Sequence, residues 1–266
     1  MGPMLEVKGL NKSFGGLRAI RDVDFAVREG EIRGLIGPNG SGKSTFFNLL
    51  SGVYAVDSGT VVFDGRDLTN SEPHEVAAAG IARTFQLLRM FTEMTVLENV
   101  MIGYHNHVKY GALAGVFGFG RVASEEKIIR DEMMEVLAFI GLEDFASIPA
   151  SELSIGQRRL LALGRAMAMK PKLLLLDEPA AGLSPVNVDN IMLIILRMKE
   201  KFNLTVVIVE HILKVVMETC DRISVLDHGV KIAEGVPSEI RDDEAVVEAY
   251  LGREMDDEEV KRAISA

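Results

Sequence analysis

The sequence predicts an α/β fold with a mixed, largely parallel central sheet. Strand-like and helix-like segments alternate through most of the 266 residues, and no internal repeat is visible. The run Leu173 to Leu176 is entirely apolar, which is typical of a parallel strand buried on both faces. A glycine-rich segment over residues 37–45 separates an apolar strand, 32–36, from an apolar helix start at 46–50. Open α/β sheets bind ligands at the carboxyl ends of their strands, so functional groups are expected there.

Composition limits the classes of protein to which the chain could belong. Hydrophobic residues make up 48% of it, which is enough for a sizeable core. The net charge of -10 and the isoelectric point near 5.1 argue against a general nucleic-acid binder. The single cysteine, Cys220, excludes an intrachain disulfide and a cysteine-rich metal site, and it fits a reducing compartment. No apolar stretch approaches the ~18 to 20 residues needed to span a bilayer, so any membrane role is expected to be peripheral.

The N-terminal region is expected to form a small antiparallel sheet. Short segments of strand-like pattern at residues 5–7, 23–27 and 59–63 predict its strands, and Asp64-Gly65 predicts a tight turn. Residues 12–16 are expected to form a loop. By frequency alone, the aromatic residue of this loop, Phe14, is a core residue more often than a platform for a ligand.

The predicted domain covers residues 4–252. Its core comprises residues 4–88 and 152–240, and residues 89–151 form a helical subdomain because they show helical periodicity and no convincing strand. The end of the chain, residues 241–266, is expected to be a helical, acidic tail. The other helices and strands are expected at residues 75–79, 81–86, 96–102, 125–140, 154–169, 173–176, 186–201, 205–210, 223–226 and 231–233.

Two segments of this domain have more than one interpretation. Residues 111–120 are too glycine-rich for a stable helix and too apolar to be fully solvated. They form either a packed loop or a docking surface, and the packed loop is favoured. Ser154 and Gln157 make a capping box, which is a sufficient structural explanation for both residues. The same helix start would also bind an anion, because its amides and hydroxyl point outward.

The glycine-rich segment matches the P-loop pattern G-x-x-x-x-G-K-[ST], in the setting between a strand and a helix that this motif requires. Glycines let backbone N–H groups approach phosphate oxygens, and the helix start adds its unpaired amides. Lys43 is expected to reach the β- and γ-phosphates, Ser44 to offer its hydroxyl to Mg²⁺, and Thr45 to bond another phosphate oxygen. A glycine turn that binds nothing is the alternative, which this context disfavours. The predicted nucleotide-binding residues of the segment are Gly37, Pro38, Asn39, Gly40, Ser41, Gly42, Lys43, Ser44 and Thr45.

Polar residues at the ends of three other strands complete a predicted site for hydrolysis of a nucleoside triphosphate. Asp177 would hold Mg²⁺ together with Ser44, because this ion takes few protein carboxylates and keeps several waters. Glu178 would orient and deprotonate the attacking water. Gln86 and His211 would reach the γ-phosphate as polar groups that sense it, and Gln86 is also a candidate ligand of Mg²⁺. The alternative is that Asp177 and Glu178 are accidental surface carboxylates.

The order of these motifs along the chain resembles that in the ATP-binding subunits of ABC transporters. The motifs are the P-loop, Gln86, the segment Leu153-Ser154-Ile155-Gly156-Gln157, the carboxylates Asp177 and Glu178, and His211. The five-residue segment is the specific part, because most P-loop folds lack it. The resemblance covers about residues 4–252. Two positions depart from the family pattern: Ile155 stands where the family usually has Gly, and Ser184 where an Asp often follows Ala181-Gly182-Leu183.

Within this family, the sequence is most similar to the branched-chain amino-acid import ATPases. The segments that carry this similarity are 14–17, 83–86, 93–99, 177–183, 209–211 and 249–252, together with an insertion around 103–124. The resemblance implies that Phe14 stacks on adenine and that residues 87–99 receive the coupling helix of a permease. It also implies that Ser154 and Gly156, with Gln157 beside them, contact ATP bound by a second subunit.

The resemblance further implies a dimer at the cytoplasmic face of the cell membrane. In such proteins the P-loop and the signature of one subunit lie too far apart to share one ATP, so a complete site needs two ATPase subunits, either identical or sister chains. ATP would favour the closed dimer, and hydrolysis to ADP would release it. The implied partners are integral-membrane permeases and, through them, a substrate-binding protein, with ATP and Mg²⁺ as ligands and no nucleic acid.

Two alternative functions are compatible with a P-loop ATPase. A soluble ABC-type ATPase that acts on DNA or ribosomes would need long coiled coils, zinc-binding cysteines or two cassettes in one chain, which the sequence does not contain. A transporter of another cargo, such as urea, short amides or exported lipopolysaccharide, stays open because an ATPase subunit does not touch its cargo. The insertion around 103–124 disfavours the lipid exporter by resemblance.

Overall fold

The computed structural model describes residues 2–84, 90–104 and 119–251, and it divides into two compact units. The first unit contains Met1–Arg83 and Lys172–Ala266, and the second contains Thr84–Pro171. These boundaries differ from the sequence-based ones, which place residues 152–171 in the core. The difference arises because the helix after Ser154 packs on the other helices of the second unit.

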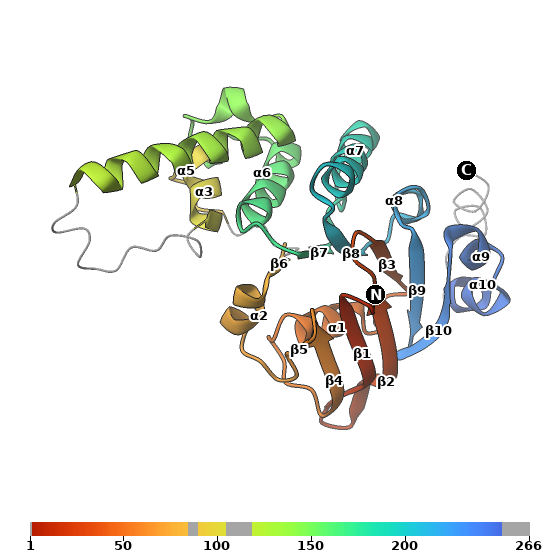
Figure 1. Cartoon of the computed structure of the whole chain (residues 1–266). Coiled ribbons are helices and arrows are strands. Elements are labelled where there is room, and N and C mark those ends of the chain that lie inside the picture. Colours follow the sequence, from red (N-terminus) through yellow and green to blue (C-terminus); the bar gives the residue numbers. More distant parts are fainter. Residues whose placement is uncertain (1, 85–89, 105–118, 252–266) are drawn as a thin grey trace. The chain divides into compact units, whose positions relative to one another are not determined.

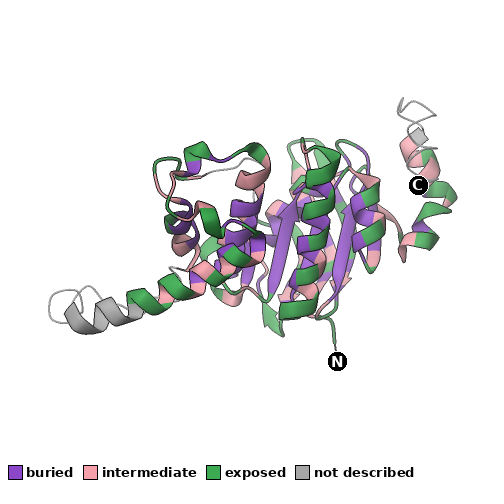
Figure 2. Ribbon diagram, turned by 90° about the horizontal axis from the view of Figure 1, so that it is seen from above, coloured by how far each residue is buried: buried purple, intermediate pink, exposed green. Residues whose placement is uncertain are grey.

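The first unit is built on a six-stranded sheet with the order β10-β9-β3-β8-β7-β6 (Figure 1). All neighbours in this order pair in parallel except β10 and β9, which form an antiparallel hairpin. The central strands are buried along their whole length, as the apolar run at Leu173 predicts (Figure 2). The mixed, largely parallel sheet is therefore confirmed. Its strands are β3 (Ile32–Ile36), β6 (Ile81–Arg83), β7 (Leu173–Asp177), β8 (Thr205–Val209), β9 (Arg222–Asp227) and β10 (Val230–Gly235).

The second sheet of this unit is antiparallel and has the order β2-β1-β4-β5. Its strands are β1 (Leu5–Phe14), β2 (Leu17–Val27), β4 (Ser58–Phe63) and β5 (Arg66–Asp67). The predicted Asp64-Gly65 turn joins β4 to β5, and both residues have positive φ. The prediction of a loop over residues 12–16 is wrong, because residues 12–14 continue β1 by pairing with β2, and only Gly15-Gly16 forms the turn.

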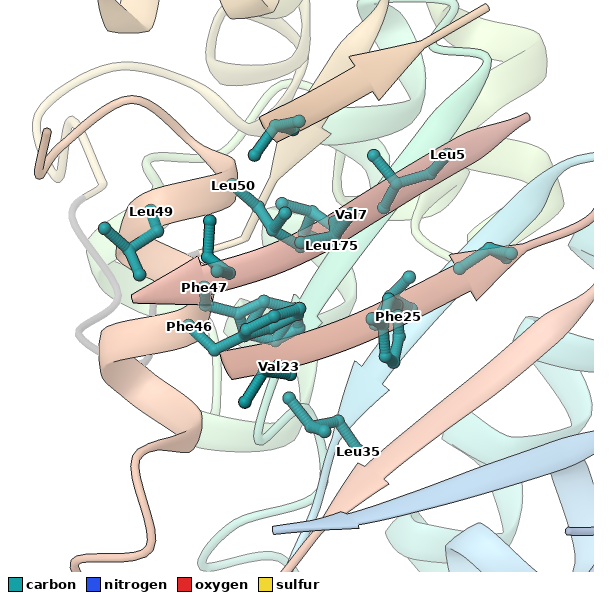
Figure 3. Packing of buried hydrophobic residues seen from close by; sticks show 14 of the residues in the cluster. Leu5, Val7, Val23, Phe25, Leu35, Phe46, Phe47, Leu49, Leu50 and Leu175 are labelled. Carbon is teal, nitrogen blue, oxygen red and sulfur yellow. The ribbon is translucent and has the colours of Figure 1, made fainter. Parts of the chain in front are cut away.

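Helix α1 (Lys43–Leu50) is packed between side chains from both sheets. Phe46 and Phe47 are fully buried, and the ring of Phe46 lies 5.1 Å from the ring of Phe25 on β2. Figure 3 shows these rings between Val23 and Phe25 of the antiparallel sheet and residues of the parallel sheet such as Leu175. The N-terminus of α1 directly follows the glycine-rich segment. The packing of α1 therefore also holds the end of that segment in place.

The other helices of the first unit are α2 (Pro73–Ala79), α7 (Pro185–Phe202), α8 (Leu213–Thr219), α9 (Pro237–Arg241) and α10 (Glu244–Leu251). Along the chain, α2 lies between β5 of the antiparallel sheet and β6, and the rest come after strands of the parallel sheet. The predicted helical tail is thus helical as far as Leu251, and its acidic stretch after that residue lies outside the described residues. Cys220 is buried, and burial raises the pKa of its thiol to about 12, so the thiol is protonated at neutral pH.

The second unit is helical. Helices α3 (Val96–Gly103), α5 (Phe119–Ile140) and α6 (Ile155–Ala168) pack on one another around Val100, Leu137 and Leu161. Close approach of α3 and α6 requires Gly103, since a Cβ there would lie 2.2 Å from the backbone oxygen of Arg165. Of the stretch 111–120, for which a packed loop is favoured, residues 119–120 begin α5 and the others lie outside the described residues. Among the residues that the structure describes, none of the helices has the length and apolar character to cross a bilayer.

Candidate functional site

The glycine-rich loop follows β3 and leads into α1 at the carboxyl end of the parallel sheet. Two of its glycines are required by backbone geometry. Gly37 has a φ of +148°, and a Cβ there would lie 2.0 Å from the backbone oxygen of Leu226. Gly42 has a φ of +108°, and a Cβ there would lie 2.6 Å from the oxygen of Ala19. The loop is therefore held against its neighbours by backbone contacts that a side chain at either position would prevent.

The ammonium group of Lys43 is buried within this loop. Its Nζ donates to the carbonyl oxygens of Gly37 and Pro38, at 2.7 and 2.9 Å. Burial lowers the pKa of Lys43 to about 8, although the negative charge of Glu178 opposes the shift. A cation that is desolvated by protein gains strongly from an anion placed beside it. The loop is accordingly suited to a phosphate chain.

The C-terminal helix α10 also reaches the loop. Burial raises the pKa of the Tyr250 hydroxyl to about 12, although the backbone of Gly37 beside it opposes the shift. The sequence did not predict a structural role for Tyr250, because nothing in residues 249–252 indicates a contact with Gly37. This contact connects the end of the described chain to the first residue of the predicted phosphate site.

Asp177, the predicted metal ligand, ends β7 and is 5% exposed. Its Oδ2 accepts a hydrogen bond of 2.7 Å from Arg83, which ends the neighbouring strand β6. Arg83 also donates to Asn48 and Ser51 on and after α1, at 2.7 and 2.9 Å. Sequence reasoning missed Arg83, although a charged residue at the end of a buried strand is a signal that could have indicated it. Arg83 thus connects the edge strand, the predicted metal carboxylate and the helix that follows the phosphate loop.

The predicted general base and the predicted histidine lie side by side. Nε2 of His211 is 2.9 Å from Oε1 of Glu178, and the His211 side chain is the more exposed of the two. Glu178 has a left-handed φ of +49°, which is uncommon for a residue other than glycine, and its N–H donates to the oxygen of Val209. This backbone conformation occurs directly after the end of β7, and strain at such positions often accompanies function.

Glu210 follows β8 directly and is 1% exposed. Its carboxylate accepts hydrogen bonds from the backbone N–H groups of Ala180, His211 and Ile212, at 2.6, 3.1 and 3.4 Å. Burial raises the pKa of Glu210, although these three donors favour the ionised form. Sequence reasoning treated Glu210 only as part of a family segment, because the partner Ala180 is 30 positions away.

In the helical unit, Ser154 and Gln157 form the predicted capping box at the start of α6. The N–H of Ser154 donates to Oε1 of Gln157 at 2.9 Å, and the N–H of Gln157 donates to Oγ of Ser154 at 3.4 Å. Ser154 is exposed, Gly156 is half-buried, and Ile155 between them is 64% exposed. The helix start is therefore accessible to a partner molecule. The side chain of Ile155 is not packed in the core of the unit.

Phe14 is exposed, which contradicts the core position that residue frequencies favour. Its side chain is 42% exposed at the end of β1, and its ring lies 5.2 Å from that of Tyr54 in an edge-to-face arrangement. Nζ of Lys12 lies 5.4 Å from the centre of the same ring. An exposed aromatic face of this kind can stack on a planar base. Gln86, which was predicted as a catalytic and metal-binding residue, lies outside the described residues.

Within the first unit, the parallel sheet places the predicted residues at one edge. The glycine-rich loop follows β3 and His211 comes after β8, while Asp177 ends β7 and Glu178 follows it. These three strands are consecutive in the sheet. A profile of the ABC transporter family matches residues 20–181. The chain belongs to the ABC transporter family. A second profile, described as the branched-chain amino acid ATP-binding cassette transporter, matches residues 230–256.

Two proteins of known description are similar in sequence to this chain over nearly their whole length. The branched-chain amino acid transport ATP-binding protein BraF of Pseudomonas aeruginosa is 40% identical over 250 residues, which cover 94% of this chain and 98% of the relative. LivG of Salmonella typhimurium, of the same description, is 41% identical over 253 residues with the same coverage. This ABC protein is therefore an ATP-binding, ATP-hydrolysing subunit of a transporter.

Solved structures resemble this ABC protein over most of their length. The ADP conformation of MJ1267, a cassette of an ABC transporter, is 36% identical, with a TM-score of 0.83 over 95% of this chain and all of that one. The dimeric structure of MJ0796, a bacterial ABC transporter cassette, is 28% identical, with a TM-score of 0.74 over 88% of this chain and 99% of that one. The first comparison supports binding of ATP or ADP, and the second describes a dimer of a related cassette.

Proposed function

We propose that this ATPase powers the uptake of branched-chain amino acids through a membrane permease, from the cytoplasmic face of the cell membrane. The observation that carries the choice of cargo is the profile match over residues 230–256, which lies outside the part matched by the general ABC profile. The relatives that cover 94% of the chain are named for the same cargo. The described part of this region includes Tyr250, which contacts the glycine-rich loop.

The proposed binding of ATP follows from the geometry of the first unit. The phosphate chain would lie along residues 37–45, where Lys43 would exchange its carbonyl partners for the β- and γ-phosphates. Phe14 would stack on adenine with its exposed face. Ser44 and Asp177 offer a hydroxyl and a carboxylate, an oxygen donor set that fits Mg²⁺, and Gln86 would be a further ligand. When bound there, this ion would neutralise charge on the phosphates.

Hydrolysis would depend on Glu178 and His211. Glu178 would accept the proton of the attacking water, and the ring of His211, 2.9 Å away, would hold the carboxylate in place and contact the γ-phosphate. Gln86 would contact the same phosphate. Arg83 would keep Asp177 in its orientation through the 2.7 Å hydrogen bond. Products are ADP and inorganic phosphate.

The proposed complete site contains two subunits. Ser154, Gly156 and Gln157 of one subunit would contact ATP held by the P-loop of the other, since the start of α6 is exposed and its helix dipole favours an anion. The partner is a second copy or a sister ATPase. Residues 87–99 would receive the permease, and a substrate-binding protein would act through that permease.

The choice of cargo is tested by uptake in the source organism. Cells in which this gene is inactivated should take up labelled leucine, isoleucine and valine at a small fraction of the normal rate. A plasmid copy should restore uptake, and a copy with Glu178→Gln should not. Labelled urea serves as the matched alternative cargo. Loss of urea uptake with normal leucine uptake would contradict the proposal.

The proposed chemistry is tested with purified protein. Glu178→Gln is expected to bind ATP, to accumulate as a dimer on size-exclusion chromatography, and to hydrolyse ATP about 10²- to 10³-fold more slowly, because the proton acceptor is lost. Asp189→Asn, at an exposed carboxylate that pairs with Lys214, is the control and should leave turnover unchanged. Full turnover by Glu178→Gln would remove Glu178 from the proposed role.

A further inference from the structure

We propose that Glu210 is a positioning residue that fixes the loops carrying Glu178 and His211 relative to one another. The proposal rests on the proposed function, because it takes Glu178 and His211 as the groups that act on ATP. Glu210 itself is buried, and its carboxylate is bound to backbone N–H groups. Its contribution is to the geometry of the catalytic pair.

One carboxylate joins two loops here. Oε1 of Glu210 accepts the N–H of Ala180 at 2.6 Å, and Ala180 belongs to the turn that follows Glu178. Oε2 accepts the N–H groups of His211 and Ile212, at 3.1 and 3.4 Å, at the beginning of the segment that leads into α8. The two oxygens of Glu210 therefore bind the backbone of the glutamate loop and the backbone of the histidine loop at the same time.

This arrangement bears directly on the 2.9 Å contact between Glu178 and His211. Only Pro179 separates Glu178 from Ala180, whose backbone N–H donates to Glu210. His211 donates to Glu210 through its own backbone N–H. A shift of either loop would change the distance between the two side chains. Misplacement of a reacting group by about 1 Å can reduce turnover about 100-fold.

The position requires a carboxylate in particular. Burial of an ionised group is unfavourable, and burial raises the pKa of Glu210, so the three N–H donors must offset that loss. Glutamine has the same shape, but one of its two terminal atoms is an NH₂ donor that would face another N–H. Replacement by glutamine would therefore release one of the two loops and leave the other held.

The test compares Glu210→Gln with a control at a similar residue. Glu31 is 7% exposed, accepts the N–H of Arg28 at 2.8 Å and pairs with Arg33, at the opposite end of β3 from the glycine-rich loop. Glu31→Gln should cost stability without affecting the catalytic pair. For Glu210→Gln, kcat is expected to fall about 10- to 100-fold while the Kd for ATP changes less than about twofold.

Thermal unfolding of both variants is measured beside kcat. A large loss of kcat in Glu210→Gln, at a melting temperature equal to that of Glu31→Gln, supports the proposal. Wild-type kcat in Glu210→Gln overturns it, and so does a loss of kcat that both variants share in proportion to their loss of stability. If Glu210→Gln does not fold, Glu210→Asp takes its place, since it keeps the charge but is too short to reach both loops.

A double-mutant cycle separates this proposal from the proposed function. If Glu210 acts through His211, the loss of kcat in Glu210→Gln should nearly vanish in a His211→Ala background. Independent, multiplicative losses would overturn the positioning role. Full turnover by Glu178→Gln would instead overturn the proposed function. Slow turnover by Glu178→Gln together with normal turnover by Glu210→Gln would overturn the positioning role alone.

Discussion

The starts of α1 and α6 both offer an anion the amides of a helix end, but they are built in opposite ways. At α1 the capping residue is Gly42, which has no side chain to cap the helix, and the loop before it is shaped by backbone contacts and glycines. At α6, Ser154 and Gln157 satisfy each other's backbone groups in a capping box. The first start leaves its amides to a ligand, whereas at the second the capping box already satisfies the N–H groups of Ser154 and Gln157.

The two helix starts also differ in charge and burial. Beside the α1 start, the buried ammonium of Lys43 has a pKa of about 8, so an incoming phosphate relieves an unfavourable desolvation. Around the α6 start, Ser154 and Ile155 are exposed. In the proposed function, the start of α1 therefore binds phosphate by itself, while the start of α6 contacts ATP that a second subunit brings to it. Three substitutions and one pH dependence test this difference.

The largest effect is expected from Lys43→Ala. Removal of the cation should lower the rate of ATP hydrolysis roughly 10²- to 10³-fold and weaken ATP binding by isolated protein, because charge on the phosphates loses its main partner. Calorimetric titration with ATP measures the binding. The fold should keep its stability, since Lys43 is desolvated and has a lowered pKa. Lys8→Ala, at an exposed lysine paired with Glu6, is the control.

Gly37→Ala should have the next largest effect. A Cβ would lie 2.0 Å from the oxygen of Leu226 at a φ of +148°, so the loop must move. We expect the free energy of unfolding in urea to fall by about 2–4 kcal/mol. Gly40→Ala is the matched variant, because Gly40 has a φ of +78° with nothing within 4 Å of the added atom. Its cost should be about 1–2 kcal/mol, from backbone conformation alone. Equal costs at both positions would contradict the role of the close contact.

Ser154→Ala tests the second helix start. Turnover by the dimer should fall about 10- to 100-fold, while ATP binding by dilute, isolated protein stays unchanged. Loss of the cap alone should reduce the free energy of unfolding by about 1 kcal/mol. Thr95→Ala removes the equivalent cap of α3 in the same unit and should cost similar stability without affecting turnover in the absence of permease. Equal turnover in the two variants would show that Ser154 only caps its helix.

The pH dependence of ATP binding should show the smallest effect. The protonated form of Lys43 binds phosphate, so bound ATP raises a pKa that stands at about 8. Affinity should therefore be constant below pH 8 and decline above it, by about tenfold near pH 9. Calorimetry in buffers of different ionisation enthalpy should detect proton uptake on binding near pH 8. Lys43→Arg should remove both effects, and constant affinity of the wild type up to pH 9.5 would contradict the role of burial.

The sequence by itself determined the features that depend on neighbours in the chain. The strand before the glycine-rich segment, the helix after it, the Asp64-Gly65 turn and the capping box at Ser154 were all predicted, because periodicity, glycine conformation and capping act within a few residues. The resemblance to a known family added the roles expected of these motifs. The same short-range reasoning failed at Phe14, whose exposure depends on where β1 ends.

Only the tertiary structure decided which distant residues meet. Arg83 and Asp177 are 94 positions apart, Glu178 and His211 are 33, and Glu210 and Ala180 are 30. They come together because β6, β7 and β8 are adjacent parallel strands, so that their carboxyl ends lie at one edge of the sheet. The order of strands depends on packing across the whole unit, which no local pattern in the sequence carries. Arg83, Glu210 and Tyr250 could therefore be assigned their contacts only once the strands and helices were in place.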